Sequence, residues 1–148
     1  LNLVYTLVSG PAGMLSDRVG RRRIIVGGWL LYGVVYLGFA LAGAAWQVWV
    51  LYALYGAYYG LSEGVARALV ADMVIPEQRG TAYGLYNAAV GITALPASVI
   101  AGLLWRGWGP WPGFGPWAPF LFGAALALLA AALLAVWLPN LGDAAEGR

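Results

Sequence analysis

The sequence predicts an all-α membrane protein, a polytopic bundle of transmembrane helices. Two features of the composition support this prediction: 62% of the 148 residues are hydrophobic, and only 9% are charged. The mean hydropathy of +0.77 exceeds what the core of a soluble domain requires. The apolar residues also gather in several long runs, and a helix needs about 20 such residues to cross a bilayer. Because there are several runs, a cleaved signal peptide does not explain them.

Five apolar runs follow one another along the chain, and each ends at a turn signal. The first run is short and has Gly10-Pro11 near its end, so we expect it to be a truncated span; the other four are full spans. Pro76 stops the third run within a polar link, and a connection rich in Trp, Gly and Pro precedes the last run. The predicted bundle covers residues 1–138, with spans at 1–15, 24–45, 48–73, 81–105 and 117–138, and a polar tail at 139–148.

The arginines are distributed unequally between the two sides of the predicted bundle. Successive loops alternate across the membrane, and cytoplasmic loops carry the excess of basic residues. One side has only Arg106, whereas the other has Arg18, Arg21, Arg22, Arg23, Arg79 and Arg148. The sequence therefore predicts an integral, multi-pass protein of the cell (plasma) membrane, with the arginine-rich loop and the C-terminus in the cytoplasm. Six tryptophans near the opposite ends fit an interfacial belt: Trp46, Trp49, Trp105, Trp108, Trp111 and Trp117.

Small residues recur at every third or fourth position on two of the runs. Such stripes allow helix backbones to approach closely in lipid, where packing drives association. We expect both stripes to form helix–helix contacts within one bundle. They are Gly56, Gly60, Gly64 and Ala68 on the third run, and Gly80, Gly84, Ala88 and Gly91 on the fourth.

The residue types present argue against several classes of function. The chain has no cysteine and no histidine, which removes disulfides, cysteine nucleophiles, haem ligation and most zinc sites. Glu63 and Asp72 lie nine residues apart on one helix and form no catalytic dyad. We therefore expect no enzyme, no metal and no cofactor. The run of three arginines is too short and too close to the membrane to indicate nucleic acid. The lack of a phosphate-binding loop favours an ion gradient over ATP as energy source.

One face of the third run carries polar side chains within a predicted span. Tyr52, Tyr55, Tyr59 and Glu63 fall within an arc of about 80°, and Arg67 follows Glu63 at a spacing that allows an ion pair. Because ionisable residues are expensive inside a membrane, they mark a functional-site hypothesis. The face is either a substrate or proton site, with Glu63 as proton carrier, or a structural ion pair with space-filling tyrosines. Asn87 on the next run is either a cavity contact or an ordinary interhelical hydrogen-bonding residue.

The arginine-rich loop reads Gly13-Met14-Leu15-Ser16-Asp17-Arg18-Val19-Gly20-Arg21-Arg22-Arg23. It resembles the signature loop of the major facilitator superfamily (MFS), Gly-x-Leu-x-Asp-Arg-x-Gly-Arg-(Arg/Lys)-x, with every fixed position filled. The segments 63–72, 79–87 and 120–123 resemble the tenth, eleventh and twelfth helices of the same transporters. This implies a twelve-helix fold of two six-helix halves around a central substrate site. The loop occurs in both halves, but the polar chain end and residues 79–84 favour the C-terminal half.

The resemblance also implies a conformational gate on the cytoplasmic side. Asp17 would lie beside the start of the eleventh helix, whose dipole favours an anion, and Arg21 would bridge to Asp72. Breaking this latch would open the bundle inward. In the alternative interpretation the arginines only fix orientation and bind lipid headgroups. The residues assigned to the gate and the signature loop are Gly13, Asp17, Arg18, Gly20, Arg21, Arg22, Asp72 and Arg79.

Together these observations predict the C-terminal part of a secondary active transporter that moves a small solute by alternating access, with a proton as the candidate coupling ion. The chain starts without methionine inside an apolar run, so we expect a fragment. Its partners would be membrane lipid, the solute and the missing N-terminal half. The alternative is an accessory or structural membrane subunit that does not transport, the product of a truncated or decayed gene.

Overall fold

Five helices form most of the protein. The computed structural model describes residues 2–137, with the backbone alone at Asp17, Arg21, Arg22 and Trp137. The polar tail predicted at 139–148 lies outside the described residues. No β-strand occurs between residues 2 and 137, which confirms the all-α class. The elements are α1 (Asn2–Val19), α2 (Arg21–Leu41), α3 (Ala45–Asp72), the short 3-10 helix η1 (Pro76–Gln78), α4 (Arg79–Arg106) and α5 (Ala118–Trp137).

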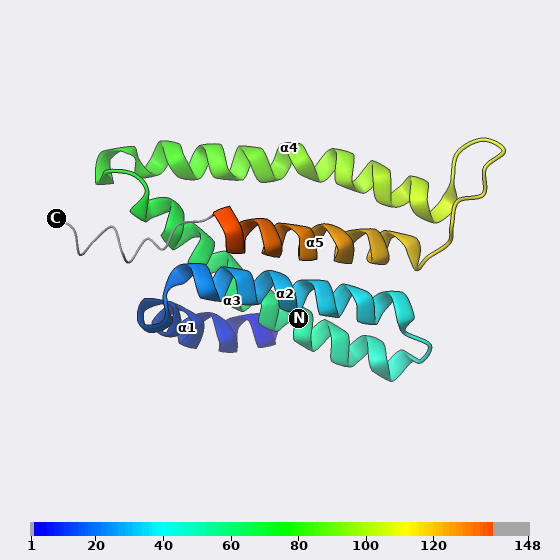
Figure 1. Cartoon of the computed structure of the whole chain (residues 1–148), viewed down its shortest axis with the longest axis horizontal. Coiled ribbons are helices and arrows are strands. Elements are labelled where there is room, and N and C mark those ends of the chain that lie inside the picture. The colour runs from blue at the N-terminus through cyan, green and yellow to red at the C-terminus, as the bar shows by residue number, and fades with distance from the viewer. Residues whose placement is uncertain (1, 138–148) are drawn as a thin grey trace.

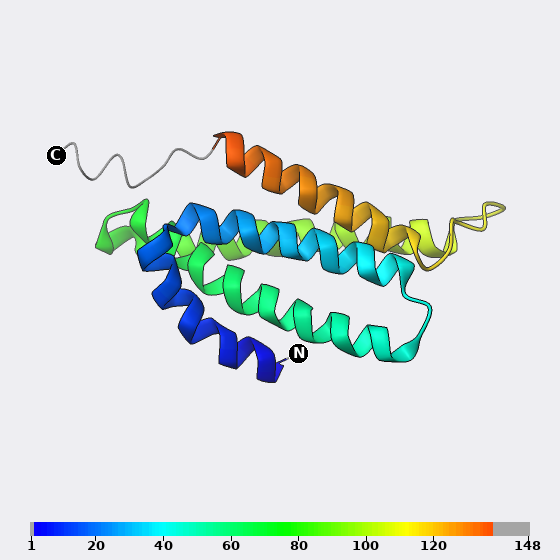
Figure 2. The ribbon, with the colours of Figure 1, turned by 60° about the horizontal axis from the view of Figure 1, so that its bottom comes forward.

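The helices run back and forth along one long axis (Figure 1). The α1–α2 junction and the α3–α4 link lie at one end, and the α2–α3 and α4–α5 connections lie at the other. Helix α2 packs between α5 and α3, and α1 packs on the opposite side of α3 (Figure 2). Helix α4 makes far fewer contacts, with α3, α5 and η1.

Three helices are long and apolar enough to cross a membrane, over Arg23–Leu41, Pro76–Arg106 and Ala118–Val136. Helix α3 is not among them, although it has 28 residues. Its tyrosines and its three charged residues, Glu63, Arg67 and Asp72, lower its hydropathy. The assignments of α3 as a full span and of the first run as a truncated span therefore stay predictions.

The outer surface of the bundle is strongly apolar along its whole length. Leu41, Leu95 and Val136 are 83%, 74% and 79% exposed. Apolar patches of this extent do not occur on soluble monomers, whereas hydrocarbon is a good solvent for them. The distribution of side chains therefore agrees with an integral, multi-pass membrane protein.

The arginine-rich segment predicted as a loop is a sharp corner between two helices. Helix α1 runs on to Val19, and α2 begins at Arg21. Only Gly20 breaks the helical path, with φ of +95°, a conformation that residues with a Cβ rarely adopt. The Gly20 N–H still donates to the carbonyl of Ser16 at 3.0 Å, so the last turn of α1 stays closed.

Glycines mark the places where the packed helices approach most closely. Gly56 and Gly60 are buried, and a Cβ on Gly60 would lie 2.9 Å from the Val8 Cβ of α1. These two positions confirm the contact predicted for the stripe on the third run. Gly64, by contrast, is exposed and has open space around it.

The stripe on α4 makes no such contact within the described residues. A Cβ added at Gly80, Gly84 or Gly91 would have nothing within 4 Å, and none of the apolar stretch of α4 is buried. The close helix–helix contact expected there is therefore not formed in this structure. The physical reason is that α4 makes few contacts with α3, α5 and η1, so its neighbours do not cover the face that carries the stripe.

Candidate functional site

Helices α2 and α3 face each other through a cluster of aromatic rings. The rings of Tyr32 and Tyr36 stack with their centroids 4.1 Å apart, and the ring of Tyr58 lies 4.8 Å from that of Tyr32. Each such pair contributes about 0.5–1.5 kcal/mol beyond the area that it buries. We call the whole set the aromatic cluster: Trp29, Tyr32, Tyr36 and Phe39 of α2, Tyr52, Tyr55, Tyr58 and Tyr59 of α3, and Phe120 of α5.

The tyrosines that the sequence analysis placed on one face of α3 differ in how deeply they are buried in this cluster. Tyr55 is partly buried, with its ring centroid 5.9 Å from that of Tyr36 on α2. Tyr52 and Tyr59 remain 47% and 39% exposed, although each touches the cluster at its edge. Tyr55 therefore fits the interpretation as a space-filling residue. Tyr52 and Tyr59 keep a larger part of their side chains exposed.

The contribution of α2 to this cluster was not predicted from the sequence. Tyr32 and Tyr36 are four residues apart and so share one face of α2. This spacing indicates a shared face, but the two tyrosines lie within a run that is otherwise uniformly apolar. Only the packing of α2 against α3 shows that these rings and Tyr58 belong to the same site.

Glu63 and Arg67 form the ion pair that their spacing allowed. The Arg67 Nη2 donates to the Glu63 Oε1 at 2.8 Å, one helical turn away. The Arg67 side chain is 54% exposed and that of Glu63 is 34% exposed. Glu63 follows Tyr59 by one turn, so four side chains form one outward strip, which we call the ion-pair face: Tyr52, Tyr59, Glu63 and Arg67.

The ion pair lies well inside the length of α3. Glu63 is nine residues before Asp72, the last residue of the helix, which corresponds to about 14 Å along the axis. The ion-pair face thus presents two opposite charges and two phenol groups on a helix whose neighbours in the bundle expose hydrocarbon. Such a face can hydrogen-bond a polar solute or exchange a proton.

The gate residues are only partly described by the structure. Arg18 is exposed in the last turn of α1, and Asp72 and Arg79 are exposed at the ends of α3 and α4 that meet the link. The α1–α2 corner and this link lie at the same end of the bundle (Figure 1). The side chains of Asp17, Arg21 and Arg22 lie outside the described residues, so the latch stays a prediction. Gly13 lies within α1 and faces open space, and Gly20 forms the corner.

Asn87 is the candidate residue on α4 that the sequence analysis assigned to the solute or proton site. It is exposed on α4, and no hydrogen bond in the described part of the chain joins it to the ion-pair face. Both interpretations of Asn87 stay predictions.

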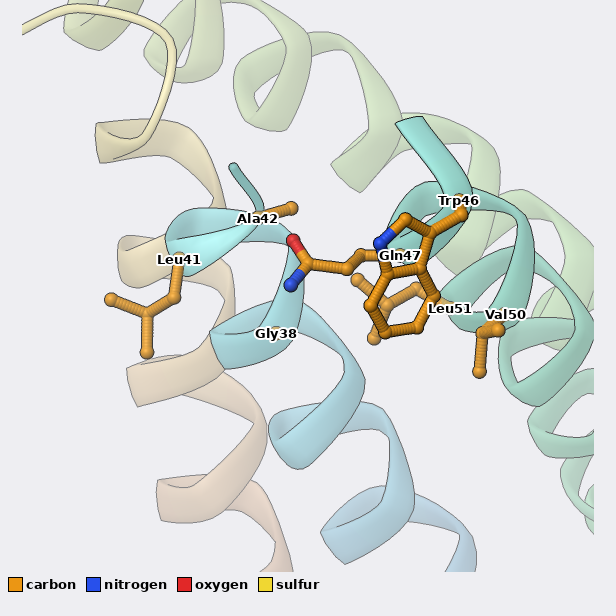
Figure 3. Close-up of a pocket in the computed structure, with 7 residues that line it drawn as sticks. All are labelled: Gly38, Leu41, Ala42, Trp46, Gln47, Val50 and Leu51. Atoms are coloured by element: carbon orange, nitrogen blue, oxygen red, sulfur yellow. The ribbon is translucent and has the colours of Figure 1, made fainter. Parts of the chain in front are cut away.

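A hollow of about 320 Å³ lies at the corner between α2 and α3 (Figure 3). Its polar group, the Gln47 amide, is already engaged: Oε1 accepts the backbone N–H groups of Gly43 and Ala44 at 2.8 and 3.1 Å. Gln47 thereby satisfies donors at the start of α3. The hollow includes no residue of the ion-pair face; it is lined by Gly38, Leu41, Ala42, Trp46, Gln47, Val50 and Leu51.

The described residues hold no cluster of three or more metal-ligating side chains of the His, Cys, Asp or Glu type. The site is therefore built from aromatic rings and a single ion pair. These groups are suited to binding and to moving a proton.

The fold and the site together define a multi-pass, all-α membrane protein with a polar face on one long helix. Comparison with known proteins identifies its family. The model of the Major Facilitator Superfamily matches residues 1–147, and the chain belongs to this superfamily. No solved structure matches the chain.

Several curated relatives are transporters by name. The chain is 41% identical over 133 residues to an uncharacterized MFS-type transporter of Methanocaldococcus jannaschii, covering 90% of this chain and 32% of that protein. It is 32% identical over 104 residues to the class C tetracycline resistance protein of Escherichia coli, covering 69% and 26%. It is 30% identical over 132 residues to the 3-(3-hydroxy-phenyl)propionate transporter of Escherichia coli K12, covering 86% and 30%. The chain thus spans about a third or less of the length of these relatives.

Proposed function

We propose that this chain is the C-terminal part of a secondary active transporter, which moves a small solute by alternating access and is driven by an ion gradient. The match of the superfamily model over residues 1–147 carries this proposal. The names of the relatives support transport as the activity and argue against an enzyme. The remaining helices of a complete transporter would close a cavity over the ion-pair face.

The ion-pair face forms part of the proposed path of the solute or the proton. Ionisable residues within membrane helices almost always face a bundle interior or a water-filled cavity. Protonation of the Glu63 carboxylate would remove its charge and release the Arg67 guanidinium, which would then be free to bind another group. A proton could thereby change the contacts of this face during the transport cycle.

The role of Glu63 is tested by Glu63→Gln in the native gene product, assayed for uptake of a radiolabelled solute with and without an imposed pH gradient. We expect the variant to lose its response to the gradient because the amide takes up no proton. The matched control is Glu77→Gln, which removes a carboxylate from η1 at the end of the bundle. A pH response that persists in Glu63→Gln would exclude Glu63 as the carrier and leave the ion pair a structural role.

The proposed gate joins Asp17 and Arg21 of the α1–α2 corner to Asp72 at the end of α3. We expect Asp17→Asn to insert into the membrane normally and to transport at least about tenfold more slowly, a loss equivalent to about 1.4 kcal/mol. Its amount in the membrane is measured by immunoblot and its uptake by the same solute assay. Wild-type uptake by this variant would count against the gate.

We propose that the corner and the C-terminus face the cytoplasm, because basic residues concentrate on that side. Arg18, Arg23 and Arg79 lie toward that end, whereas Arg106 ends α4 at the other. Protease or label access to each end in sealed vesicles of known orientation tests this assignment.

An accessory membrane subunit that does not transport is the alternative function. The mass of the native gene product, detected with an antibody against residues 139–148, distinguishes the two. A band near 15.6 kDa would favour the subunit. A band of about 45 kDa, three times that mass, would correspond to a transporter of about twelve spans, as long as its relatives.

A further inference from the structure

The connection between α4 and α5 is a folded structure held against the end of α4. The Gly107 N–H donates to the Leu103 carbonyl, and the Phe114 N–H donates to the Leu104 carbonyl, both at 2.8 Å. These bonds satisfy two of the carbonyls that a helix leaves unpaired at its C-terminus. The segment after Arg106 therefore folds back on the helix end.

Two glycines make this close fold possible. Gly107 and Gly113 have φ of +76° and +75°, and a Cβ on either residue would collide with backbone atoms of the other part of the connection. For Gly113, that Cβ would lie 2.6 Å from the Gly107 nitrogen and 2.8 Å from the Trp105 carbonyl oxygen. The backbone at the end of α4 is therefore held by hydrogen bonds and by close contacts with the connection.

A hollow of about 440 Å³ lies against the last turns of α4. Ala101, Gly102 and Trp105 form its apolar wall, and Arg106 lies at its edge. Gly102 has open space where a side chain would be, and Trp105 is 55% exposed. The hollow is thus an open, mostly apolar groove whose lining includes the side chain of Arg106.

The charge of Arg106 has no counterpart nearby in the sequence. Arg106 is the only charged residue between positions 80 and 137, a stretch that contains nearly all of α4 and the whole of α5. It ends α4, and the end of a helix that spans a bilayer lies where hydrocarbon gives way to headgroups. Tryptophans prefer the same depth, and Trp105, Trp108 and Trp117 are all at least 47% exposed around it.

We propose that this hollow binds one phospholipid molecule. Its phosphate accepts hydrogen bonds from the Arg106 guanidinium, whose planar fork suits a phosphate group. One acyl chain lies along the groove beside Ala101 and Gly102, and the Trp105 ring covers the glycerol region. The charge complementarity of a lone arginine and the apolar groove beside it point to a lipid that carries both chemistries. The proposal depends on membrane insertion of α4 and α5 and does not depend on transport.

The experiment is native mass spectrometry of the intact gene product, purified in detergent and titrated with phosphatidylglycerol. Arg106→Gln removes the phosphate contact, and Gly102→Leu fills the groove. The matched control is Gly91→Leu, which adds the same side chain to nearly the same face of α4, three turns away and also in open space. Diacylglycerol, which has the acyl chains without the phosphate, is the control ligand.

We expect Arg106→Gln to weaken phosphatidylglycerol binding about fivefold, equivalent to about 1 kcal/mol, and Gly102→Leu to weaken it at least as much. Gly91→Leu should bind as the unchanged protein does, and diacylglycerol should bind more weakly than phosphatidylglycerol. Equal binding by Arg106→Gln and the unchanged protein would overturn the proposal. So would equal loss in Gly91→Leu and Gly102→Leu, which would indicate that protein covers the whole face. Thermal unfolding of each variant separates loss of lipid from loss of fold.

Discussion

Helices α2 and α4 are both apolar enough to cross a membrane, and their surroundings in this structure are opposite. Helix α2 lies between α3 and α5, and the Tyr36 ring packs over Gly123, where a Cβ would lie 2.7 Å from it. Helix α4 buries none of its apolar stretch, although it carries a stripe of small residues like the one on α3. A stripe of small residues therefore marks where a backbone can be approached, and it does not identify what approaches it.

The tyrosines of α3 also differ from one another in their surroundings. Those directed from α3 toward α2 complete the aromatic cluster and hold the bundle together. Tyr52 and Tyr59 also belong to the cluster, and the Tyr52 ring contacts Phe39 of α2, but these two residues remain 47% and 39% exposed. The more buried and the more exposed tyrosines of α3 thus fit the structural and the functional interpretation, respectively, of the same run of residues.

The largest expected effect is that of Tyr36→Ala. The Tyr36 ring touches aromatic rings of α2, α3 and α5, so its loss leaves a cavity at the centre of the packed region. We expect a loss of about 3 kcal/mol in stability, measured by thermal unfolding in detergent. Leu95→Ala on the exposed side of α4 is the control, with a change within about 0.5 kcal/mol. Equal losses would mean that the two helices are packed alike in the native protein.

A smaller effect is expected from Gly60→Leu. The added side chain would meet Val8 and the Tyr5 carbonyl of α1, and overpacking of this kind costs about 2 kcal/mol. Gly84→Leu, placed in open space on α4, should be neutral or stabilising by about 0.5 kcal/mol, because glycine is a poor helix former. If Gly84→Leu instead destabilised the protein as much as Gly60→Leu, another part of the protein would lie against the stripe on α4.

The smallest expected effect is that of Arg67→Gln. If the ion-pair face borders a water-filled cavity, an exposed pair one turn apart contributes only about 0.5 kcal/mol. If the face borders lipid instead, the lone Glu63 carboxylate would cost about 2–3 kcal/mol. The same unfolding measurement distinguishes these two surroundings. A loss in the higher range would contradict the proposed solute path.

Much of the candidate site was predictable because helical periodicity is local. The spacing of Glu63 and Arg67 predicted a pair on one face, and the structure confirms it with a 2.8 Å contact. The burial of Gly56 and Gly60 followed from the same periodicity. The bend at Gly20 was harder to predict, because a single residue with positive φ ends one helix and starts the next without a loop.

The sequence by itself determined the helical membrane class, the order of the apolar runs and the superfamily. These depend on hydropathy, charge and a contiguous motif, all of which are properties of neighbouring residues. Only the tertiary structure decided that Tyr32, Tyr36 and Tyr58 form one cluster, that Tyr55 turns inward, and that α4 stands open. These outcomes depend on which helix lies against which face. A repeating pattern fixes the face of each helix and leaves its neighbour undetermined.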